Sequence, residues 1–240
     1  MNTDSNFKQV IANADFDKMK VTREGYYDNM KVIPGIEGSN RLLRAAFEAK
    51  LAPGSRILIV GAGGGREIGI LGESPHSFQF VGVDPSVNML AMAQEIIDER
   101  GFTDRVRLHH GKIDVLPVEE EKYDGAILAF VMHFVPDKEG EGGKLALLND
   151  IRARLKDGAP LYVSDMSFDH DEFEGMKSTF MAQTALIGME ASSAERLVTS
   201  VLPNLPIISP ARFRELATSS GFPTVIPLYR ALWYTSWVVQ

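Results

Sequence analysis

The sequence predicts an α/β protein built on a doubly wound, mostly parallel β-sheet. Two observations carry this prediction: short β-branched runs recur from Arg56 onward, and stretches with helical period separate them. The runs cover residues 57–60, 78–83, 106–109, 126–130 and 161–164. Apolar strands separated by helices of this length form right-handed βαβ crossovers. The predicted sheet is therefore parallel and covered by helices on both faces.

The stretches between the runs predict amphipathic helices with their own start and stop signals. One predicted buried stripe consists of Val87, Leu90, Ala91 and Ile97, and another consists of Leu145, Leu148, Ile151 and Leu155. Ser86 is a favoured N-cap for the first of these helices. Ser209 followed by Pro210 predicts the start of a last helix, which Gly221 ends.

The two ends of the chain and one internal segment lie outside this alternation. Residues 224–229 and 231–239 read as two strands with a link so short that they must pair antiparallel, which adds a C-terminal hairpin. Four parts of one domain follow: a helical N-terminal cover (1–51, with a helix at 37–51), a core (52–166), a helical insertion (167–205), and the last helix with the hairpin (206–240). The insertion is interpreted as a lid, with a packed extension as the alternative.

Composition excludes several kinds of chemistry. The 240 residues include no cysteine, so disulfides, thiolate metal sites and cysteine nucleophiles are absent. The five histidines lack metal-ligand spacing, and no metal is predicted. No signal peptide or membrane span is recognisable, which favours a soluble cytoplasmic protein. The net charge of −7 weighs against broad nucleic-acid binding.

A glycine cluster follows the first predicted strand directly. Gly61, Gly63 and Gly65 form a G-x-G-x-G pattern that opens the next helix, and the missing side chains let a ligand approach the main chain. A dinucleotide fingerprint would have glycine where this chain has Arg66. Such turns also occur only to pack a helix on a sheet.

An acid stands at the carboxyl end of the neighbouring predicted strand. Asp84 closes Phe80-Val-Gly-Val-Asp84, where a carboxylate can accept both hydroxyls of a ribose. The alternative is that Asp84 only ends the strand and helps to cap the helix at Ser86. The order of glycine loop and acid favours the ribose role.

From residue 51 to 168 the chain resembles the class I S-adenosylmethionine-dependent methyltransferases. The resemblance rests on the glycine motif, on the acid of Gly82-Val-Asp84, on Tyr123-Asp-Gly-Ala-Ile-Leu128, and on Leu155-Lys-Asp-Gly-Ala-Pro-Leu-Tyr-Val163 before Asp165. It implies a Rossmann-like seven-stranded sheet of order 3-2-1-4-5-7-6 and S-adenosylmethionine as cofactor, with S-adenosylhomocysteine as product. The cofactor-binding residues implied in this part of the chain are Gly61, Ala62, Gly63, Gly65, Asp84 and Pro85.

A narrower similarity points to the tRNA carboxy-S-adenosylmethionine synthases and their relatives. It rests on Phe16-Asp17, Val32-Ile-Pro-Gly35, Val163-Ser-Asp-Met-Ser-Phe168, Glu195-Arg196 and the segment 209–222. It implies that Arg196 binds the extra carboxylate of a carboxylated sulfonium cofactor, for which a guanidinium is well suited. Ile36, Ala129 and Lys112 stand where that family has a tyrosine, an asparagine and an acid, so three of its polar contacts are missing.

Other cofactor contacts are expected around this core. Ile59 stands where many such enzymes have an acid for the methionine amino group, so Glu67 is the candidate partner, or else an ordinary first-turn acid. Ile113 is expected on the adenine face. Asp114 is expected to accept from the exocyclic amine of adenine, or to be an exposed turn residue.

The segment after the fourth strand lies at the switch point of the predicted sheet, where open α/β folds bind ligands. Phe130 and His133 are expected to wall the reaction cavity, and His133 is the candidate general base. His133 alternatively shapes the pocket or has no role. Tyr26, Tyr27 and Met30 are expected to cover the cavity, or to be core residues.

Three functions remain open on this evidence. The favoured one is in-line methyl transfer from S-adenosylmethionine to a small-molecule acceptor, which needs no obligatory catalytic residue. The second is a carboxy-S-adenosylmethionine or tRNA-wobble-modification enzyme, although the acidic charge disfavours tRNA. The third is a non-catalytic nucleoside-binding module. A homodimer is a further possible partner.

Overall fold

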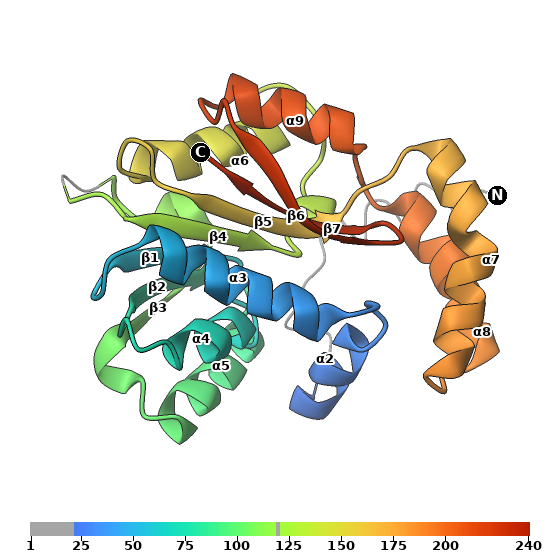
Figure 1. Ribbon diagram of the computed structural model, residues 1–240, viewed down its shortest axis with the longest axis horizontal. Coiled ribbons are helices and arrows are strands. Elements are labelled where there is room, and N and C mark those ends of the chain that lie inside the picture. Colours follow the sequence, from blue (N-terminus) through green and yellow to red (C-terminus); the bar gives the residue numbers. More distant parts are fainter. Residues whose placement is uncertain (1–21, 119–120) are drawn as a thin grey trace.

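A seven-stranded sheet forms the centre of the computed structural model, which describes residues 22–118 and 121–240 (Figure 1). The strands are β1 (Arg56–Val60), β2 (Gln79–Asp84), β3 (Val106–His110), β4 (Gly125–Ala129), β5 (Leu161–Met166), β6 (Val225–Ala231) and β7 (Tyr234–Val239). Their order is β3-β2-β1-β4-β5-β7-β6. The first five strands pair in parallel, and β7 pairs antiparallel with both β5 and β6. The predicted topology is confirmed.

Helices flank this sheet and extend beyond it. The α-helices are α2 (Arg23–Met30), α3 (Ile36–Lys50), α4 (Arg66–Gly72), α5 (Val87–Glu99), α6 (Lys144–Arg154), α7 (His170–Leu186), α8 (Ala191–Arg196) and α9 (Pro210–Ser219). The short turns are η1 (Thr103–Arg105), η2 (Ile113–Val115), η3 (Met132–Phe134), η4 (Leu197–Val201, π-helical) and η5 (Leu202–Asn204). No helix among the described residues is long and apolar enough to cross a bilayer.

The sheet buries both of its faces. Ile57 and Ile59 pack with α3, α4 and α5, whereas Leu58 and Val60 pack with α6 and α9 on the opposite face. This double burial explains why β1 reads as an unbroken apolar run rather than an alternating one.

The structure corrects one predicted helix face and one strand end. The buried residues of α5 are Met92, Ala93, Ile96 and Ile97. Val87 and Ala91 are exposed, whereas Leu90 is half-buried against the core and Ile97 is buried, so the predicted stripe is wrong for two of its four members. Apolar residues occur on overlapping faces of this helix, and the packing of α4 decides which face is covered. Strand β4 ends at Ala129, and Phe130 has a left-handed φ of 56°.

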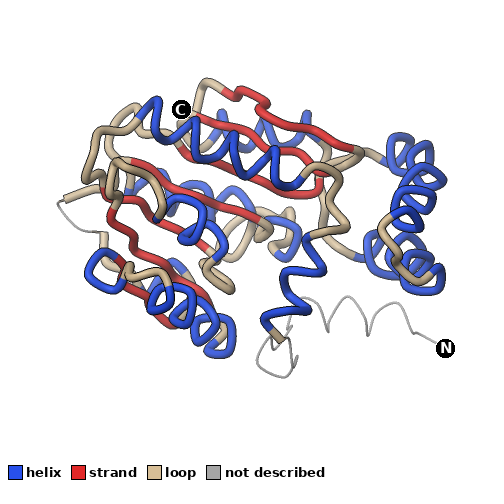
Figure 2. Tube along the Cα trace, turned by 60° about the horizontal axis from the view of Figure 1, so that its bottom comes forward, coloured by secondary structure: helices blue, strands red, loops and turns tan. Residues whose placement is uncertain are grey.

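The insertion after β5 forms a helical block that lies beyond the carboxyl end of β5 and packs on the β6–β7 turn. Figures 1 and 2 show α7 and α8 packed against each other, away from the centre of the sheet. Trp233, in the β6–β7 turn, joins this block to the hairpin through Phe173, Phe180 and Val198. The predicted helical content of the insertion is confirmed.

Candidate cofactor site

The glycine loop between β1 and α4 is tied to the neighbouring strand. The backbone N–H groups of Gly61 and Ala62 both donate to the carbonyl of Val83, at 2.9 and 3.0 Å. Gly61, Gly63 and Gly65 have φ values of 76°, 49° and 79°, in the left-handed region that favours glycine. The loop is therefore held at the carboxyl ends of β1 and β2.

Two of these glycines also allow close packing. A Cβ on Gly61 would lie 2.2 Å from the side chain of Val131, and one on Gly65 would lie 2.9 Å from the Cα of Ala93 in α5. Gly63 is different, because a Cβ there would make only ordinary contacts at 3.5 Å. Gly65 thus serves helix packing, which was the alternative explanation of the motif, while the space beside Gly63 is bordered by the side chains of Met89 and Tyr26.

Asp84 connects this loop to the start of α5 through its two carboxylate oxygens. Oδ2 accepts the N–H of Gly63 at 2.8 Å, and Oδ1 accepts the N–H of Ser86 at 2.9 Å. Asp84 therefore does help to cap helix α5 at Ser86, as the alternative explanation in the sequence analysis held. These bonds fix the orientation of the Asp84 carboxylate at the carboxyl end of β2.

Helix α2 places an aromatic ring over the loop. A Cβ on Gly64 would lie 3.0 Å from Cε1 of Tyr26, and a Cβ on Gly63 would lie 3.5 Å from the Tyr26 hydroxyl oxygen. Burial, aided by the negative charge of Glu67, raises the pKa of Tyr26. The prediction that Tyr26 covers this site agrees with its position. Tyr27 contacts Tyr26 edge-on, whereas Met30 packs in the cluster of the helical insertion.

A buried ion pair opens helix α4, directly after the glycine loop. Nη2 of Arg66 donates to Oε1 of Glu67 at 2.5 Å, and the two side chains are only 7% and 5% exposed. The Arg66 guanidinium also lies 5.1 Å from the ring centroid of Phe130 and donates to Asn40. In the sequence, Arg66 served only to exclude the dinucleotide fingerprint, and its pairing with Glu67 was not predicted. Two adjacent opposite charges directly after the glycine cluster could have indicated this ion pair.

The segment after β4 contains a second buried pair. Nδ1 of His133 lies 2.7 Å from Oδ1 of Asp165, and the His133 N–H donates to Oδ2 at 3.2 Å. An ionised carboxylate only accepts hydrogen bonds, so Nδ1 is the donor in this pair and Nε2 is left for other partners. No residue in the described part of the chain hydrogen-bonds to Nε2. The sequence singled out His133 but not Asp165 as its partner, although β4 and β5 end at the same edge.

Lys144, at the start of α6, holds the main chain of residues 132–135 through hydrogen bonds. Its Nζ donates to the carbonyls of Met132 and Val135, both at 2.5 Å, and its side chain is fully buried. Burial lowers the pKa of Lys144 to about 8, against the opposing effect of Asp165 and Asp137. A neutral amine still has two N–H donors, enough for both carbonyls.

This shifted pKa predicts a pH-dependent stability. Lys144 binds its proton more weakly in the folded chain, so the free energy of unfolding should rise between pH 8 and its ordinary pKa of 10.5. The expected rise is about 3 kcal/mol. Urea unfolding at several pH values, compared with Lys144→Met, would measure it. Lys156→Met, on the surface, is the matched control; a constant difference between the native chain and Lys144→Met would contradict the prediction.

The remaining predicted site residues lie at the carboxyl ends of the parallel strands or farther away. Pro85 is exposed, and its carbonyl lies 3.0 Å from Nε2 of His110. Ile113 is buried in the core cluster beneath α6, while Asp114 is exposed. Arg196 ends α8 and is exposed. Figure 1 shows α8 apart from α4, with α2 between them in this view. Phe16-Asp17 lies outside the described residues.

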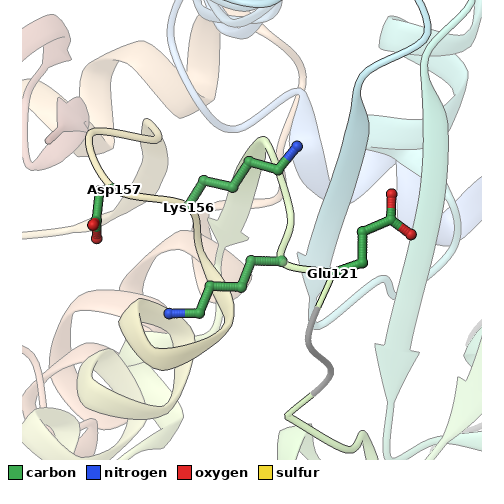
Figure 3. A pocket seen from close by; sticks show the side chains of 4 residues that line it. Glu121, Lys156 and Asp157 are labelled. Carbon is green, nitrogen blue, oxygen red and sulfur yellow. The ribbon is translucent and has the colours of Figure 1, made fainter.

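Charged surface hollows elsewhere do not belong to this site. Figure 3 shows one lined by Glu121, Lys122, Lys156 and Asp157. These residues precede β4 and β5, so the hollow lies at the amino ends of the strands, opposite Asp84. Within residues 22–118 and 121–240, no group of three or more acidic, histidine or cysteine side chains is arranged to hold a metal ion.

The sheet order, the glycine loop and its acid define the class of protein. Residues 57–158 match the family model described as a methyltransferase domain. This segment runs from β1 to the turn before β5, which is the part that carries the glycine loop and Asp84.

Solved structures with the same fold include three methyltransferases. One is an O-methyltransferase family protein from Burkholderia thailandensis (TM-score 0.67, 13% identity, covering 96% of this chain and 63% of that one). The second is the S-adenosylmethionine-dependent methyltransferase SibL (TM-score 0.59, 19% identity, covering 89% of this chain and 61% of that one). The third is the N,N-8-amino-8-demethyl-D-riboflavin dimethyltransferase RosA from Streptomyces davawensis (TM-score 0.57, 20% identity, covering 95% of this chain and 61% of that one). The search of curated proteins finds no match.

At these identities the structural likeness establishes the fold, and this chain spans about three fifths of each of the three proteins. Together the matched domain and the sheet order support an S-adenosylmethionine-dependent methyltransferase. They do not distinguish the narrower carboxy-S-adenosylmethionine branch, which stays a prediction.

Proposed function

We propose that this protein transfers the methyl group of S-adenosylmethionine to a small-molecule acceptor that carries an ionisable O–H or N–H. The observation that carries the cofactor assignment is the Asp84 carboxylate, bound to the N–H of Gly63 at 2.8 Å and oriented at the end of β2. The adjacent Gly63 has no side chain of its own, so a ligand can approach the main chain beside this carboxylate.

The charges around the loop agree with this cofactor. Asp84, Glu67 and Arg66 sum to −1, whereas S-adenosylmethionine carries a sulfonium, an ammonium and a carboxylate, and so +1. Bound there, the sulfonium supplies an activated methyl group. The residues of the chain then have to orient the cofactor, exclude water and receive a proton. Tyr26, packed over Gly63 and Gly64, excludes water from the loop.

His133 supports an acceptor that loses a proton. Asp165 holds the imidazole through Nδ1 and thereby leaves Nε2 as the basic atom, close to the carboxyl end of β4. A histidine fixed in this way can take the proton of a hydroxyl or amine as the methyl–oxygen or methyl–nitrogen bond forms. Asp165 acts through His133 and is a positioning residue.

A small acceptor is favoured over tRNA by the charge of −7. RosA, which shares the fold, is named for dimethylation of a small riboflavin derivative. A carboxylated sulfonium finds less support, because the matched arginine, Arg196, is exposed in α8.

The cofactor assignment predicts a specific loss of affinity. Asp84→Asn should weaken S-adenosylmethionine binding by about 1.5–3 kcal/mol, or about 10- to 150-fold, because a charge-assisted acceptor is lost. Isothermal titration calorimetry would measure it. Asp98→Asn, which changes a surface carboxylate of α5, is the matched control and should bind like the native chain.

Equal affinity of Asp84→Asn and the native chain would overturn the ribose role. Failure of the native chain to bind S-adenosylmethionine or S-adenosylhomocysteine at millimolar concentration would overturn the proposed function. If the native chain binds carboxy-S-adenosylmethionine more tightly than S-adenosylmethionine, and Arg196→Ala loses this preference, the protein is instead an enzyme of the carboxy-S-adenosylmethionine type.

A further inference from the structure

The helical insertion contains a cavity of its own. This insertion cavity has a volume of about 540 Å³ and lies between residues 168–177 and residues 198–207. Volumes of about 300–1,000 Å³ are typical of small-molecule sites. All residues that line it follow β5, and none belongs to the glycine loop, to α2 or to η3. The insertion cavity is therefore separate from the proposed cofactor site.

The lining of the insertion cavity is largely apolar. Apart from Lys177, its buried and half-buried members are all apolar side chains, namely Phe168, Phe173, Val198, Leu202, Leu205 and Ile207. The rings of Phe168 and Phe173 stack with their centroids 4.7 Å apart and their planes at 18°. A ligand with an apolar body would gain by burying that body against these side chains.

One wall of the insertion cavity has an uncommon backbone conformation. The turn η4 is π-helical over Leu197–Val201, and Val198 and Thr199 of this turn line the cavity. π-Helical turns are rare in proteins and occur frequently at functional sites. The backbone of η4 is thus a second indication of a ligand site, independent of the volume of the cavity.

The polar part of the lining has a net negative charge. Lys177 pairs with Glu174 at 2.6 Å, so these two charges compensate each other. Asp169 is the N-cap of α7, and its Oδ1 accepts the N–H of Glu172 at 2.9 Å. With His170 neutral, the lining residues sum to −1. The N-terminus of a helix offers only about half a positive charge, so the lining stays negative beside α7.

We propose that the insertion cavity binds a small amphiphilic cation, in which an aromatic or aliphatic body carries one ammonium group. The body lies against Phe168 and Leu202, and the ammonium group lies beside the carboxylate of Asp169. The two stacked rings add a cation–π attraction for the same charge. An anion of the same shape is disfavoured, because Asp169 and Glu174 repel it. This site goes beyond the proposed function and needs neither the cofactor nor His133.

Three probes that share one aromatic body test this charge preference: 3-phenylpropylamine, 3-phenylpropanol and 3-phenylpropanoate. Ligands of about ten heavy atoms bind in roughly the millimolar range, so the shifts of amide signals in two-dimensional NMR spectra are a suitable measure of affinity. The amine should bind the native chain about three- to tenfold more tightly than the alcohol. The carboxylate should bind more weakly than the alcohol.

Asp169→Asn tests the residue that provides the charge. Asparagine caps helices about as well as aspartate, so this substitution removes the charge and keeps the cap of α7. The amine and the alcohol should bind this variant equally. Asp171→Asn is the matched control, because Asp171 is an exposed acid of the same helical turn that does not line the cavity. Its preference for the amine should equal that of the native chain.

Thr199→Trp tests the location of the site. Thr199 is exposed and lines the cavity, so an indole at this position would occupy the space that the probes need. All three probes should lose affinity for this variant. Ser200→Trp places the same ring on the neighbouring exposed residue, which does not line the cavity, and should bind the probes like the native chain.

Four results would overturn the inference. The first is a failure of all three probes to bind the native chain at millimolar concentration, and the second is equal binding of the amine and the alcohol. The third is an undiminished preference for the amine in Asp169→Asn, and the fourth is undiminished binding of the amine to Thr199→Trp. S-adenosylmethionine should bind all of these variants like the native chain. A chain that binds the amine but not S-adenosylmethionine would refute the proposed function alone.

Discussion

Replacement of Trp233 by alanine is expected to lower the free energy of unfolding by about 3–5 kcal/mol. The indole is fully buried in the β6–β7 turn, and its ring centroid lies 4.7 Å from Phe180 and 5.3 Å from Phe173. The Trp233 carbonyl also accepts the N–H of Ser167 at 2.8 Å, just after β5. The indole thus joins the hairpin to the helical insertion, while the main chain of the same residue connects the hairpin to the end of β5.

Urea unfolding followed by far-ultraviolet circular dichroism would measure this loss without depending on tryptophan fluorescence. Leu186→Ala is the matched control, because Leu186 is 88% exposed at the end of α7. Its effect should be within about 0.5 kcal/mol. A loss below about 1 kcal/mol for Trp233→Ala would show that the insertion does not depend on this contact.

Gly65→Ala is expected to lower the free energy of unfolding by about 2–5 kcal/mol, the sum of two costs. The first is the left-handed φ of 79°, which an alanine adopts unfavourably. The second is overpacking, since the new Cβ would lie 2.9 Å from the Cα and 3.1 Å from the Cβ of Ala93. Relief requires α5 to move away from the loop, so S-adenosylmethionine binding should weaken too.

Gly158→Ala separates these two costs. Gly158 has a similar φ of 71°, but nothing lies within 4 Å of its added Cβ. Only the backbone cost of about 1–2 kcal/mol should appear there, with cofactor affinity unchanged. Equal losses in the two variants would mean that the contact between the glycine loop and α5 is not tight, and would contradict the packing role of Gly65.

The sheet was predictable because its signals are local. The apolar run of β1 leads directly into Gly61. Of the stripe predicted for α6, Leu148, Ile151 and the C-cap residue Leu155 are buried, and Leu145 is half-buried against the same cluster. The caps were predictable for the same reason: Ser86 accepts the N–H of Met89, and Ser209 accepts that of Arg212. Short-range hydrogen bonds and side-chain period depend only on neighbours along the chain.

The buried face of α5 was not predictable in this way. Its sequence contains apolar residues on more than one face, and burial is decided by contacts with α4 and the sheet, which are distant along the chain. The same holds for the end of β4, where Phe130 leaves the strand. Its ring lies against Arg66, 64 positions earlier.

By itself the sequence determined the parallel sheet, the glycine loop and the acid at the end of β2, because each depends on local pattern. The order of the strands was implied by the resemblance to a known family. Only the tertiary structure decided which charged groups meet: Asp165 holds His133, and Tyr26 covers a loop that also borders Arg66 and Glu67. These partners come from separate strands and helices. Their pairing follows from burial, where a charge without a partner is costly, and the sequence does not state which distant residue provides it.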